Sequence, residues 1–340
     1  MKRNELLKRL GFTVPETKMK RVIISSDITA EADDPFAVMH HLLSPSEDIR
    51  GIIAAHYEMM PRMITARFKN TSLSVLTPQQ QDTAKRLMAN RGKTMGYSFA
   101  EGEKILQLAQ IDDVPMLHGA AYELSADGDP LPESEGADFI IEEAMKESSR
   151  PLFVVFQGNI TDLAIAYLKE PKIAEKLTAV WIGGARYPYG GRESNLLQDT
   201  KAANIIFQSK IPLWQIPINV YETMEFSLAE LNLQIRSCGD IGKYLFEEMT
   251  EKNHSLSRLT GLGIFPHGET WSLGDNPTVA VLLQAGTRIC WDDRPAPSFV
   301  REDGTYGPEN KERMIRVYNY VDARLTLSDM FAKMQLVYVC

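Results

Sequence analysis

The sequence has little cysteine and no long apolar run. Cys238, Cys290 and Cys340 lie far apart among 340 residues, and no pair has the C-x-x-C spacing of a metal site. Isolated thiols of this kind are typical of a reducing compartment. No stretch approaches the ~18 apolar residues that span a bilayer, and residues 1–20 carry charges where a secretory signal would be apolar. We therefore expect a cytoplasmic protein without a membrane segment.

Positive charge is also in the minority. The chain has 37 Lys and Arg residues against 45 Asp and Glu residues, a net charge of -8. A nucleic-acid backbone would be repelled by this charge, and no basic stripe with interleaved aromatic residues offsets it. The composition predicts no nucleic-acid partner and is ordinary for a globular protein.

The hydrophobic pattern predicts an α/β protein. Short apolar runs predict strands at residues 21–26, 49–55, 115–117, 152–156, 179–182 and 213–216. Segments with helical spacing of apolar residues lie between them, at residues 35–43, 136–146, 162–168 and 201–208. Such alternation makes a mostly parallel central sheet with helices on both faces. We expect helices in residues 59–112 and 222–273 to cover the sheet or the site, a polar extension at residues 1–20, and one domain over residues 21–340.

The densest chemical feature is an acidic segment directly after the first predicted strand. Asp27, Glu31, Asp33 and Asp34 place four carboxylates in eight residues, just before a predicted helix. Carboxylates this close repel one another, and a hard divalent cation relieves the repulsion because it prefers oxygen ligands. Taken alone, the segment is explained equally well by an acidic surface loop in which Asp33 or Asp34 caps the helix. Phosphoryl transfer by a nucleophilic aspartate fits less well, because Thr29 stands where a second aspartate is expected.

With this segment in place, the chain resembles the inosine-uridine preferring nucleoside hydrolase family. Asp27-Ile28 followed by Glu31-x-Asp33-Asp34 is similar to the acidic motif that opens that family, with Ser25 where its first aspartate stands. Further segments agree in the same order: residues 156–164 (FQGNITDLA), residues 182–185 (IGGA), residues 193–195 (ESN) with Asp199, and residues 274–277 (GDNP). The resemblance covers about residues 21–335.

The resemblance implies a nucleoside hydrolase-like fold and hydrolysis of the N-glycosidic bond of a ribonucleoside-like substrate. It implies a Ca²⁺ cofactor held by the side chains of Asp27, Asp34 and Asp275 and by the backbone carbonyl of Gln157. Three carboxylates and one carbonyl are reasonable calcium ligands. Asp27 is also the implied base for the attacking water. Family members commonly form dimers or tetramers, so a homo-oligomer is expected.

The substrate side follows from the same positions. Asp33 matches the residue that contacts the ribose hydroxyls, and Glu193 and Asn195 match positions that hold the 5′ side of the sugar. Asn195 has an alternative role as a helix cap, and Asp275 has the same alternative at the helix that begins near residue 277.

The chain departs from the family pattern where the base would leave. Gly274 stands in the place of a histidine that is a candidate proton donor. His267 is the candidate substitute, and Trp271 is a candidate to stack on the base. The loop after residues 182–185 is shorter than usual, so an expected asparagine contact to the sugar is missing. A calcium-dependent sugar- or nucleoside-binding relative with little or different turnover is therefore the alternative to a hydrolase.

Overall fold

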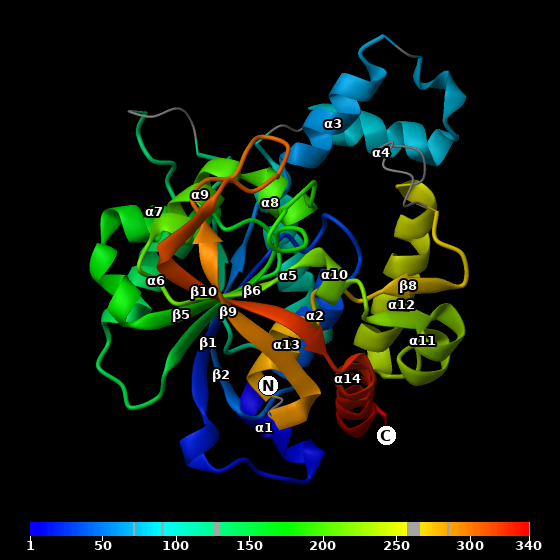
Figure 1. The fold of residues 1–340 in the computed structure, drawn as a ribbon. Helices are drawn as coiled ribbons and strands as arrows, with labels where there is room; N and C mark the ends of the chain where they lie inside the picture. The colour runs from blue at the N-terminus through cyan, green and yellow to red at the C-terminus, as the bar shows by residue number, and fades with distance from the viewer. Residues whose placement is uncertain (71, 90–91, 125–128, 257–265, 284–285, 340) are drawn as a thin grey trace.

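The computed structural model describes residues 1–339 except residues 71, 90–91, 125–128, 257–265 and 284–285. An eight-stranded sheet with the order β3-β2-β1-β4-β5-β6-β10-β9 runs through its centre (Figure 1). The strands are β1 (Lys20–Ser26), β2 (Glu47–Ala54), β3 (Met116–His118), β4 (Leu152–Phe156), β5 (Leu177–Ile182), β6 (Leu213–Ile216), β9 (Ile289–Pro297) and β10 (Glu309–Val321). Neighbouring strands are parallel except β9 and β10, which form an antiparallel pair at one edge.

Both faces of the sheet are buried, which is why its central strands are continuously apolar. On β1, Val22 and Ile24 belong to one hydrophobic cluster and Ile23 to the other. Helices α2 (Asp34–Leu42), α5 (Thr94–Leu108), α13 (Pro277–Leu283) and α14 (Ala323–Tyr338) contribute to the first cluster, whereas α6 (Glu135–Met145), α7 (Thr161–Lys169) and α9 (Thr200–Gln208) contribute to the second (Figure 1). The predicted α/β fold, a mostly parallel sheet with helices on both faces, is confirmed.

Two further groups of elements lie beside the carboxyl edge of the sheet. The first consists of α3 (Met59–Phe68), η3 (Leu73–Val75) and α4 (Pro78–Ala89), and the second of β7 (Glu225–Ser227), α11 (Leu228–Gln234), α12 (Gly239–Ser255) and β8 (Thr270–Ser272). Helices α4 and α12 contact each other, and β7 pairs with β8 in an antiparallel ribbon. The short helix α10 (Ile218–Tyr221) follows β6 directly, whereas α8 (Ser194–Gln198) follows β5 after the loop of residues 183–193.

The N-terminal residues pack against the opposite end of the sheet. They form α1 (Arg3–Leu7), η1 (Lys8–Leu10) and η2 (Glu16–Lys18). The buried guanidinium of Arg3 donates to the backbone carbonyls of Leu42, Ser44 and Glu47 at 2.7, 2.8 and 2.7 Å. This arrangement ties the segment to the turn between α2 and β2. Within the described part of the chain, no helix combines the length and the apolar character that crossing a membrane requires.

Candidate active site

The acidic segment forms a loop between β1 and α2 in which Asp27 and Asp34 are buried and Glu31 and Asp33 are partly buried. The side chains of Asp27 and Asp34 are both 3% exposed. Asp33 is the N-cap residue of α2, but its side chain makes no capping hydrogen bond. Ser26 Oγ donates to Asp34 Oδ1 at 2.6 Å. In an acidic surface loop that caps a helix, the carboxylates would be exposed and would accept hydrogen bonds from the first amides of the helix. The structure shows neither feature, so the helix-capping alternative is wrong.

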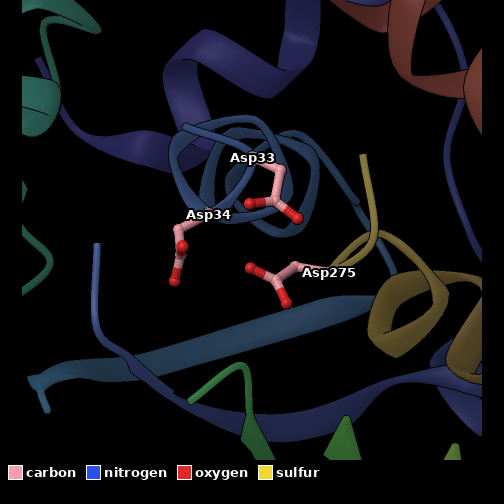
Figure 2. A group of neighbouring side chains, drawn as sticks. All are labelled: Asp33, Asp34 and Asp275. Atoms are coloured by element: carbon pink, nitrogen blue, oxygen red, sulfur yellow. The ribbon is translucent and has the colours of Figure 1, made fainter. Parts of the chain in front are cut away.

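Asp33, Asp34 and Asp275 form a compact three-aspartate group. Each offers one carboxylate oxygen that lies within 4.8 Å of those of the other two. Figure 2 shows these carboxylates turned toward a common space, with Asp275 reaching it from the loop that precedes α13. Because calcium–oxygen distances are about 2.3–2.6 Å, two ligands of one ion lie at most about 5 Å apart. The spacing therefore fits a single shared cation.

Asp27 and Gln157 border the same space. Asp27 lies close to Asp34, and its pKa is raised by burial and by the negative charge of Asp34. A Cβ at Gly158 would lie only 2.7 Å from Asp27 Oδ1, so the loop after β4 approaches this carboxylate as closely as a glycine permits. Gln157 Nε2 donates to Thr278 Oγ1 at 3.0 Å, while its Oε1 is buried and has no hydrogen-bond partner among the described residues. Such an orphaned oxygen is an available ligand or acceptor.

The surroundings disfavour negative charge on these aspartates. Burial is the largest cause of the raised pKa of four carboxyl groups, those of Asp27, Asp33, Asp34 and Asp275. Repulsion from the charge of Asp34 raises the pKa of the other three further. Burial, with repulsion from Asp34, also raises the pKa of Glu31 to about 7. A cation would remove this penalty by favouring the ionised forms.

Lys252 of α12 lies next to the acidic loop, and burial lowers the pKa of its ammonium group. Its Nζ donates to the backbone carbonyls of Thr29 and Glu31 at 2.7 and 2.8 Å. Its charge also counteracts the raised pKa of Glu31 and of Asp34. Nothing in the sequence pattern pointed to this residue, since a lysine in a charged amphipathic helix is ordinarily solvated. Lys252 therefore fixes the path of the loop that carries the aspartates.

Glu193 and Asn195 line the same cavity as the aspartates. Glu193 is the N-cap residue of α8, and its carboxylate accepts four hydrogen bonds, from the amides of Gly184, Asn195 and Leu196 and from the hydroxyl of Tyr221. Asn195 Nδ2 donates to the carbonyl of Ile182 at 3.1 Å. These bonds hold both side chains rigidly at the sugar end of the predicted site. Tyr221, the last residue of α10 after β6, could have been selected from its place just after a strand but was not.

The site residues predicted from the sequence line two adjoining cavities. The acidic cavity is lined by Asp27, Asp33, Asp34, Gln157, Glu193, Asn195 and Asp275, among others. The outer cavity shares Asp33, Glu193, Tyr221 and Gly274 with it and extends to His267 and Trp271. The rings of His267 and Trp271 are stacked, with centroids 4.2 Å apart and an angle of 21° between their planes. Every selected residue therefore borders one continuous space.

Comparisons with known proteins point to one family. A family model described as inosine-uridine preferring nucleoside hydrolase matches residues 22–327. The pyrimidine-specific ribonucleoside hydrolase RihA of Salmonella typhimurium is 28% identical over 218 residues, which are 61% of this chain and 63% of that protein. RihA of Salmonella paratyphi A is 27% identical over 161 residues, 40% of this chain, so the match spans about half (51%) of that relative.

Solved structures show the same fold. The purine-preferring ribonucleoside hydrolase from Gardnerella vaginalis superposes with a TM-score of 0.71 at 20% identity, covering 94% of this chain and 100% of that one. The family match covers most of the chain, including the acidic loop, the Gln157 segment and the Asp275 loop. The chain belongs to the inosine-uridine preferring nucleoside hydrolase family.

Proposed function

We propose that this protein is a calcium-dependent N-ribosyl hydrolase that cleaves the N-glycosidic bond of a ribonucleoside-like substrate. The observation that carries the proposal is the three-aspartate group, whose carboxylate oxygens lie within 4.8 Å of one another at the carboxyl edge of the sheet. Ligands of parallel α/β sheets bind at this edge. Family membership supplies the reaction class for this geometry.

The donor set suits a hard cation. Carboxylate and amide oxygens without thiols or imidazoles favour Ca²⁺ or Mg²⁺ over transition metals. The proposed ligands are the side chains of Asp27, Asp34 and Asp275 and the backbone carbonyl of Gln157. The side-chain Oε1 of Gln157, which is buried without a hydrogen-bond partner among the described residues, is a further oxygen available there. Ca²⁺ would supply positive charge that makes a nearby water more acidic and attracts the sugar hydroxyls.

The side chains would divide the remaining work. Asp27, which borders the same cavity as the three-aspartate group, would accept the proton of the attacking water. Asp33 lies in the three-aspartate group, where it would meet the ribose hydroxyls. Glu193 and Asn195, fixed by their hydrogen bonds, would position the 5′ side of the sugar. The carboxylates together favour the positive charge that develops on the ring as the C–N bond breaks.

The outer cavity would receive the leaving group. Trp271 provides an aromatic surface stacked on His267. Burial lowers the pKa of the His267 imidazole, which disfavours the charged form of the ring. Its role as proton donor stays a prediction.

A second candidate function is calcium-dependent sugar binding with little turnover. Gly274 supports it, because no donor side chain stands there and a Cβ would lie 3.1 Å from Tyr221 Cδ2 and 3.3 Å from Asp33 Oδ2. The ring of Tyr221 occupies the space next to Gly274. A larger residue at position 274 would have to displace this ring.

Hydrolysis of common purine and pyrimidine nucleosides, measured as released reducing sugar, tests the proposal together with calcium titration calorimetry. We expect Asp34→Ala to lose calcium binding and activity together, while the exposed control Glu312→Gln keeps both. An Asp34→Ala protein that cuts nucleosides as well as the parent would contradict the proposal. A parent that binds calcium and ribose but cuts no nucleoside would favour the second candidate.

A further inference from the structure

Helix α2 contacts the loop of Asp275 near both of its ends. Its first residue, Asp34, belongs to the three-aspartate group together with Asp275. In its last turn, the fully buried His41 lies with Nε2 3.0 Å from the hydroxyl oxygen of Thr278, just after Asp275 in the sequence. A buried imidazole is costly unless its polar nitrogens have partners. The contact therefore joins the helix that carries Asp34 to the segment that carries Asp275.

The hydroxyl of Thr278 connects His41 to two residues of the proposed calcium site. It donates to the backbone carbonyl of Asp275 at 2.7 Å, and it accepts from Gln157 Nε2 at 3.0 Å. A hydroxyl has one proton and two lone pairs, and a carbonyl oxygen can only accept. Because the proton is committed to Asp275, His41 Nε2 must donate to the second lone pair. All of the bonding capacity of this hydroxyl is thus used, which leaves it a single orientation.

Glu47, the first residue of β2, fixes the orientation of the His41 ring. Glu47 Oε2 lies 2.6 Å from His41 Nδ1, and neither side chain is accessible to solvent. A partner at one ring nitrogen determines which tautomer the ring presents on its other side. Replacing a buried pair of this kind by apolar side chains of similar volume often costs no stability. Its polar contacts are therefore the feature that a function must explain.

The neighbouring His40 holds the same loop at a second point. Its Nδ1 lies 2.9 Å from Asn276 Oδ1, and its Nε2 lies 2.8 Å from Asp329 Oδ2. Asn276 is fully buried. Because the loop has this second anchor, loss of His41 alone should loosen the loop without releasing it.

We propose, building on the calcium-dependent function above, that His41, oriented by Glu47, is a positioning residue that sets the affinity for calcium through Thr278. The hydroxyl of Thr278 holds the backbone of Asp275 and the side chain of Gln157, so the oxygens around the ion are arranged before it binds. Partners that orient metal ligands typically contribute roughly 10- to 100-fold to metal affinity. Among the described residues that line the acidic and outer cavities, His41, Glu47 and Thr278 are absent, so their effect reaches the site through other residues.

Calcium titration calorimetry on variants of the full chain tests the proposal. Thr278→Val replaces the hydroxyl by a methyl group, and we expect it to weaken calcium binding by about tenfold or more. His41→Leu removes the donor to that hydroxyl and should weaken binding in the same direction. Thr278→Ser keeps the hydroxyl and should bind calcium like the parent.

Val279→Ala is the matched control for general destabilisation. Its side chain is fully buried at the next position of α13, but it has no polar atom. It should lower the Tm of the calcium-free protein, as a large-to-small change in a core does, and it should leave the calcium affinity unchanged. A Thr278 whose role is only structural would behave like this control.

The outcomes separate the two proposals. If the parent binds calcium and Thr278→Val binds it as tightly as Val279→Ala does, the positioning role is refuted while the calcium site and the hydrolase function stand. If the parent binds no calcium, the calcium-dependent function fails and the positioning role fails with it. If His41→Leu does not fold, Thr278→Val decides the matter, because it changes a single group and its rescue by Thr278→Ser is measured beside it.

Discussion

Replacing Asp275 by asparagine should stabilise the calcium-free protein and abolish its stabilisation by calcium. The side chain is 5% exposed, and its carboxylate lies within 4.8 Å of those of Asp33 and Asp34. Two unit charges at such a distance repel by roughly 3 kcal/mol at an effective dielectric constant of about 20. The raised pKa of Asp275 means that protonation already relieves part of this repulsion. We therefore expect a gain of about 2 kcal/mol in the free energy of unfolding, or about 3 °C in Tm for a chain of 340 residues.

Thermal unfolding in EDTA and in excess calcium measures both effects. Calcium at 100 times its dissociation constant should stabilise the parent by about 2.7 kcal/mol, whereas Asp275→Asn should gain almost nothing. Asp293→Asn, an exposed aspartate on β9, is the matched control and should respond to calcium like the parent. The reasoning is refuted if Asp275→Asn is less stable than the parent in EDTA and still gains the full calcium shift.

Further predictions concern pH, the loop and the sugar wall. The carboxyls of the three-aspartate group have pKa values that are higher in the folded than in the unfolded protein. The stability that they contribute is therefore fully present below the unfolded pKa of about 3.9 and is lost as the pH rises through the folded pKa. Tm in EDTA should fall from pH 5 to pH 8, and a Tm that does not change over this range would contradict the prediction. Lys252→Met removes two charged hydrogen bonds to the loop and should cost about 2 kcal/mol in urea unfolding; a loss below about 0.5 kcal/mol would mean that the loop holds its path without it. Tyr221→Phe removes the bond to Glu193 and should cost about 1 kcal/mol, with KM for a nucleoside raised; an unchanged KM would show that the sugar wall does not depend on this hydroxyl.

The parallel strands were predictable because each is a short apolar run buried on both faces. Residues 152–156 were expected as a strand and are β4. The β9–β10 pair was missed because β9, at the sheet edge, is mostly exposed and mixes Asp, Arg and Pro with its apolar residues. The three-residue strands β7 and β8 are too short to show any alternation. Edge and ribbon strands depend on partners distant in sequence, which a local pattern does not reveal.

The site was predictable in part for a different reason. The acidic loop could be recognised locally, because four carboxylates follow a buried strand. Asp275, 241 positions after Asp34, was reached only through the family resemblance, and the structure brings the two together. Lys252 was missed because it binds two backbone carbonyls, which leave no trace in a sequence pattern. Tyr221 was missed because its partner, the carboxylate of Glu193, is distant in the sequence. The expected homo-oligomer and cytoplasmic location stay predictions.

A crystal structure with Ca²⁺ and ribose would test the shared cation most directly. We predict one ion within about 2.3–2.6 Å of oxygens from both Asp34 and Asp275, with the sugar hydroxyls turned toward it. An ion held elsewhere, or ribose bound in this space with the three carboxylates empty of metal, would contradict the assignment.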